Sequence, residues 1–599
     1  MIEAIEWPAA AASFTALAVC PNCGNVESKQ FILRAPWPHA TTADGRVGLL
    51  RCPACGCGFV YPAKTADYAA EQADGGSGLA FYLQQGAGLS GIASNVAALD
   101  RPAGTRLLEV GCGFGFGLDF ARRALGWNVV GLDPSPFAAA GRACLDLPIE
   151  SRYLVIDDPA LGDRFDVVMA SEVIEHVASP PAFARTLRSA LRDGGSLVLT
   201  TPDVEAVSPA TPRGILVPLL SIGYHLVLQS ASSLAGILHD AGFVDVDVRR
   251  VGGGQLIAQC RRGPLPQGSF ATMTNYPGAA NPGFRDQYRR YLRDAAEAAD
   301  TDSDLWFGLT ARTYREAVNA ADRPAADALW MAFSTACRRR FGSHPEAATN
   351  SVADTAAESL DSLVVREPLC LGPVLLHRAF HRLLAGERRS AVGDVLQRAA
   401  DACDRLRRSL QRIGSDDGDA EDVGWVAGAE ALLCAAEGGA KNLPERFDAL
   451  GASPADAIAR RDGQPLRTEQ YRRRIFVSLI NAAQLDEADR LADVVQAVEA
   501  RATVPGILLA DDELDALFCA AVRELQRREG GAARALDLLR QLRAACDRAC
   551  AAGRGGSAVS LMPLARDREI LALKVLGRKQ EAKALRRSSP AANVGSRIW

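Results

Sequence analysis

The chain has 599 residues, of which 48% are hydrophobic and 23% charged, the balance of a globular protein rather than a disordered one. One hydrophobic core stops growing at about 250–300 residues, so this length predicts two to four domains. The formal net charge of −4 weighs against a protein that mainly binds nucleic acid, because such proteins carry a basic surplus.

The N-terminal stretch predicts no export signal, because Glu3 and Glu6 stand where such a signal needs basic residues. The longest apolar run, GILVPLLSIGYHLVLQ, is shorter than the ~20 residues of a spanning helix. We therefore expect a cytoplasmic protein with no membrane span.

Two C-x-x-C pairs, each followed by glycine, come next: Cys20 with Cys23, and Cys52 with Cys55. The glycines permit the left-handed backbone of a metal-binding turn, and two such turns can give four thiolates to one tetrahedral Zn²⁺. We predict a zinc ribbon over residues 1–64 with a structural zinc ion. Cys57 is a further thiol that could replace Cys55, although the paired spacing favours Cys55.

A strand–helix alternation begins at residue 105, after a segment (65–104) that we interpret as a helical cap or linker. The runs RLLEV, NVVGLD, FDVVMAS and GSLVLTT are typical of strands, and stretches of helical spacing lie between them. This order predicts a largely parallel sheet with helices on both faces over residues 105–262. VDVDVRRV and QLIAQC would close the sheet as an antiparallel hairpin.

A glycine-rich turn follows the first of these strands in LLEVGCGFGFG. Glu109 precedes the glycines, and Asp133 ends the second strand. The pattern lacks the last glycine of G-x-G-x-x-G and the lysine of G-x-x-x-x-G-K-[ST], which disfavours dinucleotides and nucleotide triphosphates. An acid before the first glycine suits a ligand with an ammonium group, and a carboxylate at the tip of the second strand suits a ribose diol.

These residues resemble motif I of the class I S-adenosylmethionine-dependent methyltransferases, from about residue 105 to 261. The resemblance implies an α/β Rossmann-like core with a seven-stranded sheet. It places the methionine and ribose parts of the cofactor along Gly111, Gly113 and Gly115. Glu109 would serve the amino group, and Asp133 both ribose hydroxyls.

The next match to that family is FDVVMASEVIEHVASP, which resembles the fourth strand and its loop. It implies that Ser171 and Glu172 border the cofactor. The residue that contacts the adenine stays open between Ser151 and Asp157.

Methyl transfer requires an aligned acceptor, exclusion of water and usually a base. By the resemblance, His176 lines the mouth of the site and His225 faces the acceptor, and Tyr224 and Tyr82 are possible helpers. His239 lies in mid-helix, where we expect it at the surface. Residues 204–228 are expected to form part of a lid or acceptor pocket.

A ribbon before this core resembles the deoxysugar C-methyltransferases and their relatives in polysaccharide clusters. That implies O- or C-methylation of a small molecule or glycan. The small net charge disfavours nucleic acid as the acceptor. The chain differs from them at Tyr224, where some have an acid, and it lacks their second α/β domain. The alternatives are a non-catalytic scaffold that keeps cofactor binding, or a protein or RNA methyltransferase.

The C-terminal half changes character after a predicted linker over residues 263–299. Helical stretches rich in Ala, Leu and Arg fill residues 300–599, with breaks at Gly386, Gly438, Gln484, Gly530 and Gly577. Breaks about 50 residues apart are typical of stacked helical hairpins, and they resemble tetratricopeptide-type repeats. We expect this region to recruit a protein partner or the substrate. If the two halves are independent, truncation after about Cys260 should leave cofactor binding intact.

Overall fold

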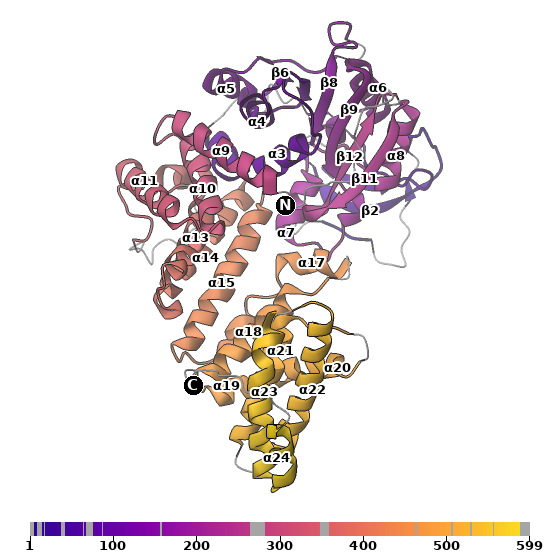
Figure 1. Ribbon diagram of the computed structural model, residues 1–599. Helices are drawn as coiled ribbons and strands as arrows, with labels where there is room; N and C mark the ends of the chain where they lie inside the picture. The colour runs from indigo at the N-terminus through magenta and orange to yellow at the C-terminus, as the bar shows by residue number, and fades with distance from the viewer. Residues whose placement is uncertain are drawn as a thin grey trace. The chain divides into compact units, whose positions relative to one another are not determined.

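The computed structural model is shown in Figure 1. It describes residues 5–8, 15–16, 18–37, 42, 44–63, 65–66, 76–86, 88–155, 158–263, 282–347, 359–461, 464–504, 507–527, 530–554 and 556–587. Asp157 and residues 264–281 of the predicted linker lie outside this set. The chain divides into two compact units: Met1–Leu384 with Asp401–Gly424, and Ala385–Ala400 with Trp425–Trp599.

A seven-stranded sheet forms the core of the first unit, in the order β11-β12-β9-β8-β5-β6-β7. Its strands are β5 (Arg106–Val110), β6 (Asn128–Leu132), β7 (Ile149–Glu150), β8 (Phe165–Ser171), β9 (Leu191–Pro202), β11 (Val244–Val251) and β12 (Gln255–Arg261). Strands β9 to β7 run parallel, and β11 and β12 form the antiparallel hairpin at one edge. The predicted Rossmann-like fold and its closing hairpin are confirmed.

Helices cover both faces of this sheet (Figure 1). They are α3 (Leu89–Ala97), α4 (Phe116–Leu125), α5 (Pro136–Leu145), α6 (Pro180–Ala190) and α8 (Ala231–Asp240). Because side chains alternate along a strand, Leu107 and Met169 pack with α3, α4 and α5, whereas Leu108 and Ala170 pack with α6 and α8. The central strands are thus buried on both sides, which explains their continuous apolar runs.

The cysteine pairs lie in turns that connect strands of a second sheet, whose strand order is β1-β2-β3-β4-β10. Its strands are β1 (Thr15–Ala16), β2 (Lys29–Pro36), β3 (Arg46–Arg51), β4 (Gly58–Tyr61) and β10 (Val227–Leu228). Strand β10 comes from the methyltransferase-like region and pairs antiparallel with β4. The N-terminal segment is therefore joined to the core by a shared sheet.

Helix α9 (Pro282–Ala298) occupies the last part of residues 263–299, which we predicted as a linker. Tyr288, Tyr291 and Leu292 of this helix are buried in the same cluster as Phe120 of α4. The Tyr291 hydroxyl donates to Oδ2 of Asp119, 3.1 Å away. A linker has no such apolar face, so α9 belongs to the core.

The first unit also contains shorter helices and part of the C-terminal half. Before the core lie α2 (Gly76–Phe81) and the π-helix η2 (Tyr82–Gly86); within it lie the 3-10 turns η3 (Ile174–His176), η4 (Val204–Ala206) and η5 (Gly252–Gly254), and α7 (Arg213–Leu220). After α9 come α10 (Asp304–Asn319), α11 (Arg323–Phe341), α12 (Leu360–Arg366) and α13 (Leu371–Leu384).

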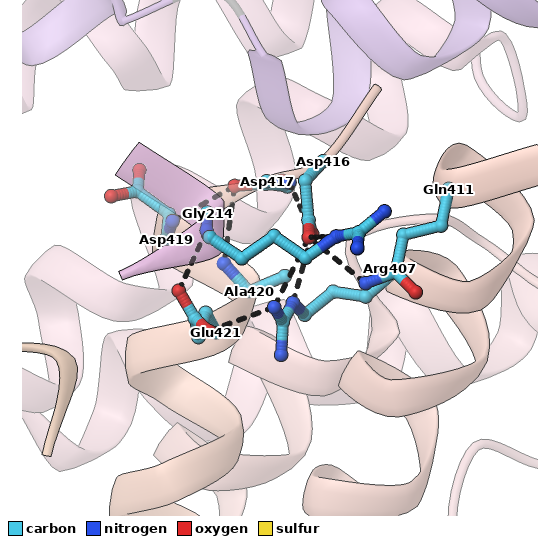
Figure 2. A network of polar contacts seen from close by, with 9 residues as sticks. Gly214, Arg407, Gln411, Asp416, Asp417, Asp419, Ala420 and Glu421 are labelled. Atoms are coloured by element: carbon cyan, nitrogen blue, oxygen red, sulfur yellow. Dashed lines mark hydrogen bonds and ion pairs between the residues drawn. The ribbon is translucent and has the colours of Figure 1, made fainter. Parts of the chain in front are cut away.

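A polar network joins α7 to residues far along the chain in the same unit (Figure 2). The Gly214 N–H donates to Glu421 at 2.9 Å. Arg407 bridges Glu421 and Asp416, with its shortest contact, 2.8 Å, to Glu421. Gly214 lies so near Gly418 that an added Cβ would come within 2.8 Å of its Cα, so this contact requires glycine.

The remaining described elements are helical: η6 (Arg389–Ala391), α14 (Gly393–Arg412), α15 (Gly418–Glu437), α16 (Leu443–Asp448), α17 (Pro454–Arg461), α18 (Arg467–Asn481), α19 (Leu485–Asp489), α20 (Ala492–Ala502), α21 (Asp511–Gln526), α22 (Gly531–Ala551), α23 (Gly556–Val575) and α24 (Lys579–Arg587). All five predicted breaks fall between helices, which confirms a C-terminal region built of helices. One cluster from Trp425 to Ala565 forms the main core of the second unit. Among the described helices, none has the length and apolar character to cross a membrane.

Candidate functional site

A cavity of about 930 Å³ opens at the carboxyl ends of β5, β6 and β8. In open α/β sheets this end is where ligands bind, because the loops there leave a crevice. The predicted cofactor residues Glu109, Gly111, Gly113, Asp133, Ser171 and Glu172 line it. Gly115 lies beside them as the N-terminal cap of α4.

The glycines let the backbone pass where a side chain would collide. Gly111 and Gly113 have positive φ of 69° and 50°, the left-handed region that glycine occupies without cost. A Cβ on Gly113 would lie 2.9 Å from the Tyr82 hydroxyl, and one on Gly111 2.4 Å from Cγ2 of Val173. The turn thus presents bare backbone to the cavity.

Asp133 is oriented by two backbone N–H groups. Gly113 donates to Oδ2 and Ser135 to Oδ1, each at 2.8 Å. These bonds hold the carboxylate beside the glycine turn and leave it lone pairs for further donors, since each oxygen can accept more than one hydrogen bond. This is the environment expected of a group that accepts from a diol.

Glu109 lies on the other side of the turn and is 2% exposed. Its Oε2 has no hydrogen-bond partner among the described residues. Burial, and then the charge of Asp133, raise the pKa of Glu109 to about 8. A buried acid of this kind is stabilised as a carboxylate when a cation approaches it.

Gly117 is a site residue that the sequence reasoning missed. A Cβ there would meet the two carboxylate oxygens of Glu109 at 2.7 and 2.8 Å. The fourth alternating glycine of the motif was the available signal, and its role is to make room for Glu109.

Ser171 and Glu172 follow β8 and face the same cavity. Glu172 adopts a φ of 57°, which is strained for a residue with a side chain and is common at functional sites. Burial raises the pKa of its carboxyl to about 7. Its Oε1 and the Ser171 hydroxyl have no hydrogen-bond partner within the described part of the chain.

The side of the cavity beyond β7 is formed by Arg152, Tyr153 and Leu154. Ser151, itself described, is absent from the lining, and Asp157 lies outside the described residues. No sequence pattern points to Tyr153, because its position depends on a loop without regular secondary structure.

Of the two histidines predicted at the site, one lines the cavity and the other lies behind its wall. His176 lines it, whereas His225 lies behind, 6% exposed, with its ring centroid 4.6 Å from that of His176. No residue of 204–228, all of which the structure describes, lines this cavity, so the predicted lid or acceptor pocket gains no support from it. His239 is exposed on α8.

Backbone carbonyls fix both imidazoles. Nδ1 of His176 lies 3.2 Å from the Tyr224 carbonyl oxygen, and Nδ1 of His225 lies 2.8 Å from that of Leu219. Tyr224 therefore contacts His176 through its main-chain carbonyl. Burial lowers the pKa of His176 to about 4 and that of His225 to about 3, so both rings are neutral near pH 7.

The cysteine pairs come together as predicted. The Sγ atoms of Cys20, Cys23, Cys52 and Cys55 lie within 4.8 Å of one another. The Cys20–Cys55 and Cys23–Cys52 separations are both 3.7 Å. Tetrahedral Zn²⁺ with bonds of about 2.3 Å would set thiolates about 3.8 Å apart, so the group fits such an ion. Cys57 lies 3.5 Å from Cys20 and is the neighbouring thiol.

Comparison with known proteins identifies the kind of domain that contains this cavity. Residues 87–248 match a family model described as a methyltransferase domain. The ubiquinone biosynthesis O-methyltransferase of Methylobacterium nodulans is 41% identical over 100 residues, which cover 16% of this chain and 40% of that relative. The same enzyme of Cereibacter sphaeroides is 41% identical over 103 residues, 16% of this chain and 41% of the relative.

Among solved structures, the S-adenosylmethionine-dependent methyltransferase of Mesorhizobium loti is 23% identical, covering 29% of this chain and 100% of that one, with a TM-score of 0.25. The chain spans about two fifths of the curated relatives named above. The family match, the sheet order and the glycine turn all support the same assignment of residues 87–248. Residues 87–248 form a methyltransferase domain of the class I, S-adenosylmethionine-dependent type.

Proposed function

We propose that this protein transfers a methyl group from S-adenosylmethionine to an oxygen atom of a small molecule. The observation that carries the proposal is the pair of acids beside the glycine turn, with Oε2 of Glu109 buried and unpartnered in the described structure. That oxygen suits the cofactor's ammonium group, and the backbone-held Asp133 suits its ribose. When bound, the cofactor supplies an electrophilic methyl group on a sulfonium.

The chain's own residues provide binding, orientation and a place for the acceptor's proton. Tyr82 and Phe137, with ring centroids 5.3 Å apart, form an apolar wall beside the glycine turn and exclude water. His176 is the neutral imidazole that lines the cavity, so it is the candidate base for an acceptor hydroxyl. His225, behind it, is a positioning residue.

The choice of an oxygen acceptor is supported by the relatives, whose names describe O-methyltransferases. A small molecule or one sugar of a glycan suits a cavity of about 930 Å³ lined by aromatic and apolar side chains. The helical C-terminal region is proposed to bind a protein partner or to recruit the substrate, as helical arrays commonly do.

Calorimetry with S-adenosylhomocysteine tests the cofactor site on the full chain. We expect one site per chain and an affinity at least tenfold weaker in Asp133→Ala, because the ribose loses its acceptor. Asp193→Asn is the matched control, since that side chain is 94% exposed. Labelled methyl transfer into a small-molecule extract then tests catalysis. Cofactor binding without transfer into any fraction would favour the scaffold alternative, and absence of binding would refute the proposal.

A further inference from the structure

Tyr82, which lines the cavity, belongs to the π-helix η2, just before the methyltransferase domain. π-Helices are rare and occur frequently at functional sites. The ring centroid of Tyr82 lies 5.3 Å from that of Phe137 and 6.2 Å from that of Phe116. Because a Cβ on Gly113 would come within 2.9 Å of the Tyr82 hydroxyl, this side chain packs directly against the glycine turn.

The Tyr82 hydroxyl lies close to both predicted cofactor acids. Burial, and then the charges of Glu109 and Asp133, raise the pKa of Tyr82, so its hydroxyl stays protonated. A protonated phenol can donate one hydrogen bond. The amino-acid end of S-adenosylmethionine has a carboxylate beside its ammonium group, so a neutral donor near Glu109 complements that end. The position of η2 therefore matters for the cofactor.

Helix α10 binds the carbonyl end of η2. The last carbonyls of a helix have no partner within it. Nη1 of Arg312 donates to the carbonyl oxygen of Leu83 at 3.0 Å and to that of Gln84 at 3.4 Å. Nη2 donates to the carbonyl oxygen of Gln85 at 3.5 Å. One guanidinium thus satisfies three successive carbonyls that lie 227 to 229 residues earlier in the chain.

The close approach of α10 to η2 requires a glycine. Gly308 lies in the second turn of α10, where a Cβ would come within 2.1 Å of the Leu83 carbonyl oxygen and 2.9 Å of Cα of Gln84. Glycine in a helix interior costs about 1 kcal/mol relative to alanine. The contact with η2 gives this unfavourable residue a structural reason.

The side chain of Gln84, which is 2% exposed, binds η2 to the same part of the chain a second time. Its Nε2 donates to Oδ1 of Asp304 at the start of α10, 2.8 Å away. Its Oε1 accepts from the N–H groups of Leu369 at 2.7 Å and Cys370 at 3.4 Å, just before α13. All these residues lie in the first compact unit. Two segments beyond the methyltransferase domain therefore fix η2.

We propose that Arg312 and Gln84 are positioning residues that hold Tyr82 against the cofactor site. This inference rests on the proposed function, because it takes S-adenosylmethionine as the ligand. Within the described part of the chain, no residue after Gln255 lines the cavity. Helix α10 and the turn before α13 thus act on cofactor affinity through η2, without contacting the cofactor. This gives the first helices of the C-terminal half a role besides recruitment.

A double-mutant cycle on the full chain, measured by calorimetry with S-adenosylhomocysteine, tests the inference. We expect about tenfold weaker binding in Arg312→Met and in Tyr82→Ala, and a combined variant within about twofold of Tyr82→Ala alone, because Arg312 acts through Tyr82. Arg315→Met is the matched control: it removes a guanidinium from the same helix, where its ion pair is with the adjacent Glu316. Its affinity should equal that of the unaltered protein.

Hydrogen-exchange mass spectrometry of the cofactor-free protein provides a second measurement. Residues 82–86 should exchange faster in Arg312→Met than in the unaltered protein, and at an unchanged rate in Arg315→Met, because only the first variant frees the carbonyls of η2. Gln84→Met removes the other attachment of η2. If Arg312→Met does not fold, the same cycle with Gln84→Met decides the result.

Unchanged affinity in both Arg312→Met and Gln84→Met would overturn the inference. It would also be overturned if the effects of Arg312→Met and Tyr82→Ala multiplied, since Arg312 would then act independently of Tyr82. In either case the proposed function stands. If the unaltered protein binds no S-adenosylhomocysteine, the proposed function fails, and exchange in residues 82–86 then decides whether Arg312 positions Tyr82.

Discussion

At the scale of single residues, the site depends on side chains that are buried before any ligand arrives. Glu109 is the clearest case, because its carboxylate is enclosed under the first turn of α4 by Gly117 and Met169. The free energy spent on burying this acid is recovered when a cationic group binds beside it. The residue is therefore a better cofactor ligand than an exposed acid would be, at the expense of stability in the free protein.

The first prediction concerns the pH dependence of that stability. The pKa of Glu109 is raised in the folded chain to about 8 from an ordinary 4.5. Its contribution to stability is thus complete below pH 4.5 and is lost as the pH rises towards 8, at up to about 1.4 kcal/mol per pH unit. In Glu109→Gln, the free energy of unfolding of the cofactor-free protein should fall less over this window.

Chemical denaturation at several pH values measures this slope. Asp193→Asn removes one carboxylate from an exposed position and should keep the slope of the unaltered protein. Equal slopes in the unaltered protein and Glu109→Gln would show that Glu109 ionises normally in the folded chain.

At the scale of elements, the N-terminal sheet is coupled to the histidine region. Strand β4 pairs with β10, and the Val60 N–H donates to the Leu226 carbonyl oxygen at 2.9 Å. Leu226 follows His225 directly, and its own N–H donates to the Glu175 carbonyl oxygen at 2.7 Å. We propose that a structural zinc ion at the cysteine pairs stabilises this sheet and, through it, the position of His225.

The second prediction follows from that coupling. Cys52→Ser should remove about one equivalent of zinc and speed hydrogen exchange in β10, because a small metal-bound sheet loses its order with its ion. Metal analysis and exchange mass spectrometry measure the two effects. Cys144→Ser, on the exposed face of α5, is the control.

The same measurement decides between the neighbouring thiols. We expect zinc loss in Cys55→Ser and retention in Cys57→Ser, since the C-x-x-C turn contains Cys55. The reverse result would make Cys57 the fourth ligand, and full zinc content in every cysteine variant would end the metal assignment.

At the scale of the whole molecule, the first unit extends well beyond the methyltransferase domain. Helices α9 and α10 bury Tyr288, Tyr291 and Leu309 in the cluster that contains Phe120. The expectation that the core ends near residue 262 is therefore replaced by one in which later helices complete it.

The third prediction is that a chain ending at residue 262 will be less stable or insoluble. Removal of α9 and α10 exposes the apolar face of α4, and fully burying one large apolar side chain contributes about 1.5–3 kcal/mol. Thermal unfolding compared with the full chain measures the loss. A truncated chain with the melting temperature and S-adenosylhomocysteine affinity of the full chain would contradict this account.

The sequence alone determined the features in which neighbouring residues act on one ligand. The glycines between Glu109 and Asp133 and the two C-x-x-C pairs could be interpreted directly, because close backbone approach and thiolate geometry require those residue types at fixed short spacings. The strand and helix order followed from periodicity for the same local reason.

Only the tertiary structure decided which distant residues meet. It brought His225 to Glu175, fifty residues earlier in the chain, and packed α9 onto α4 across a segment that carried no signal of such a contact. It also separated His225 from the cavity that His176 lines. These outcomes depend on how buried surfaces fit together, and packing of this kind has no periodic trace in the sequence.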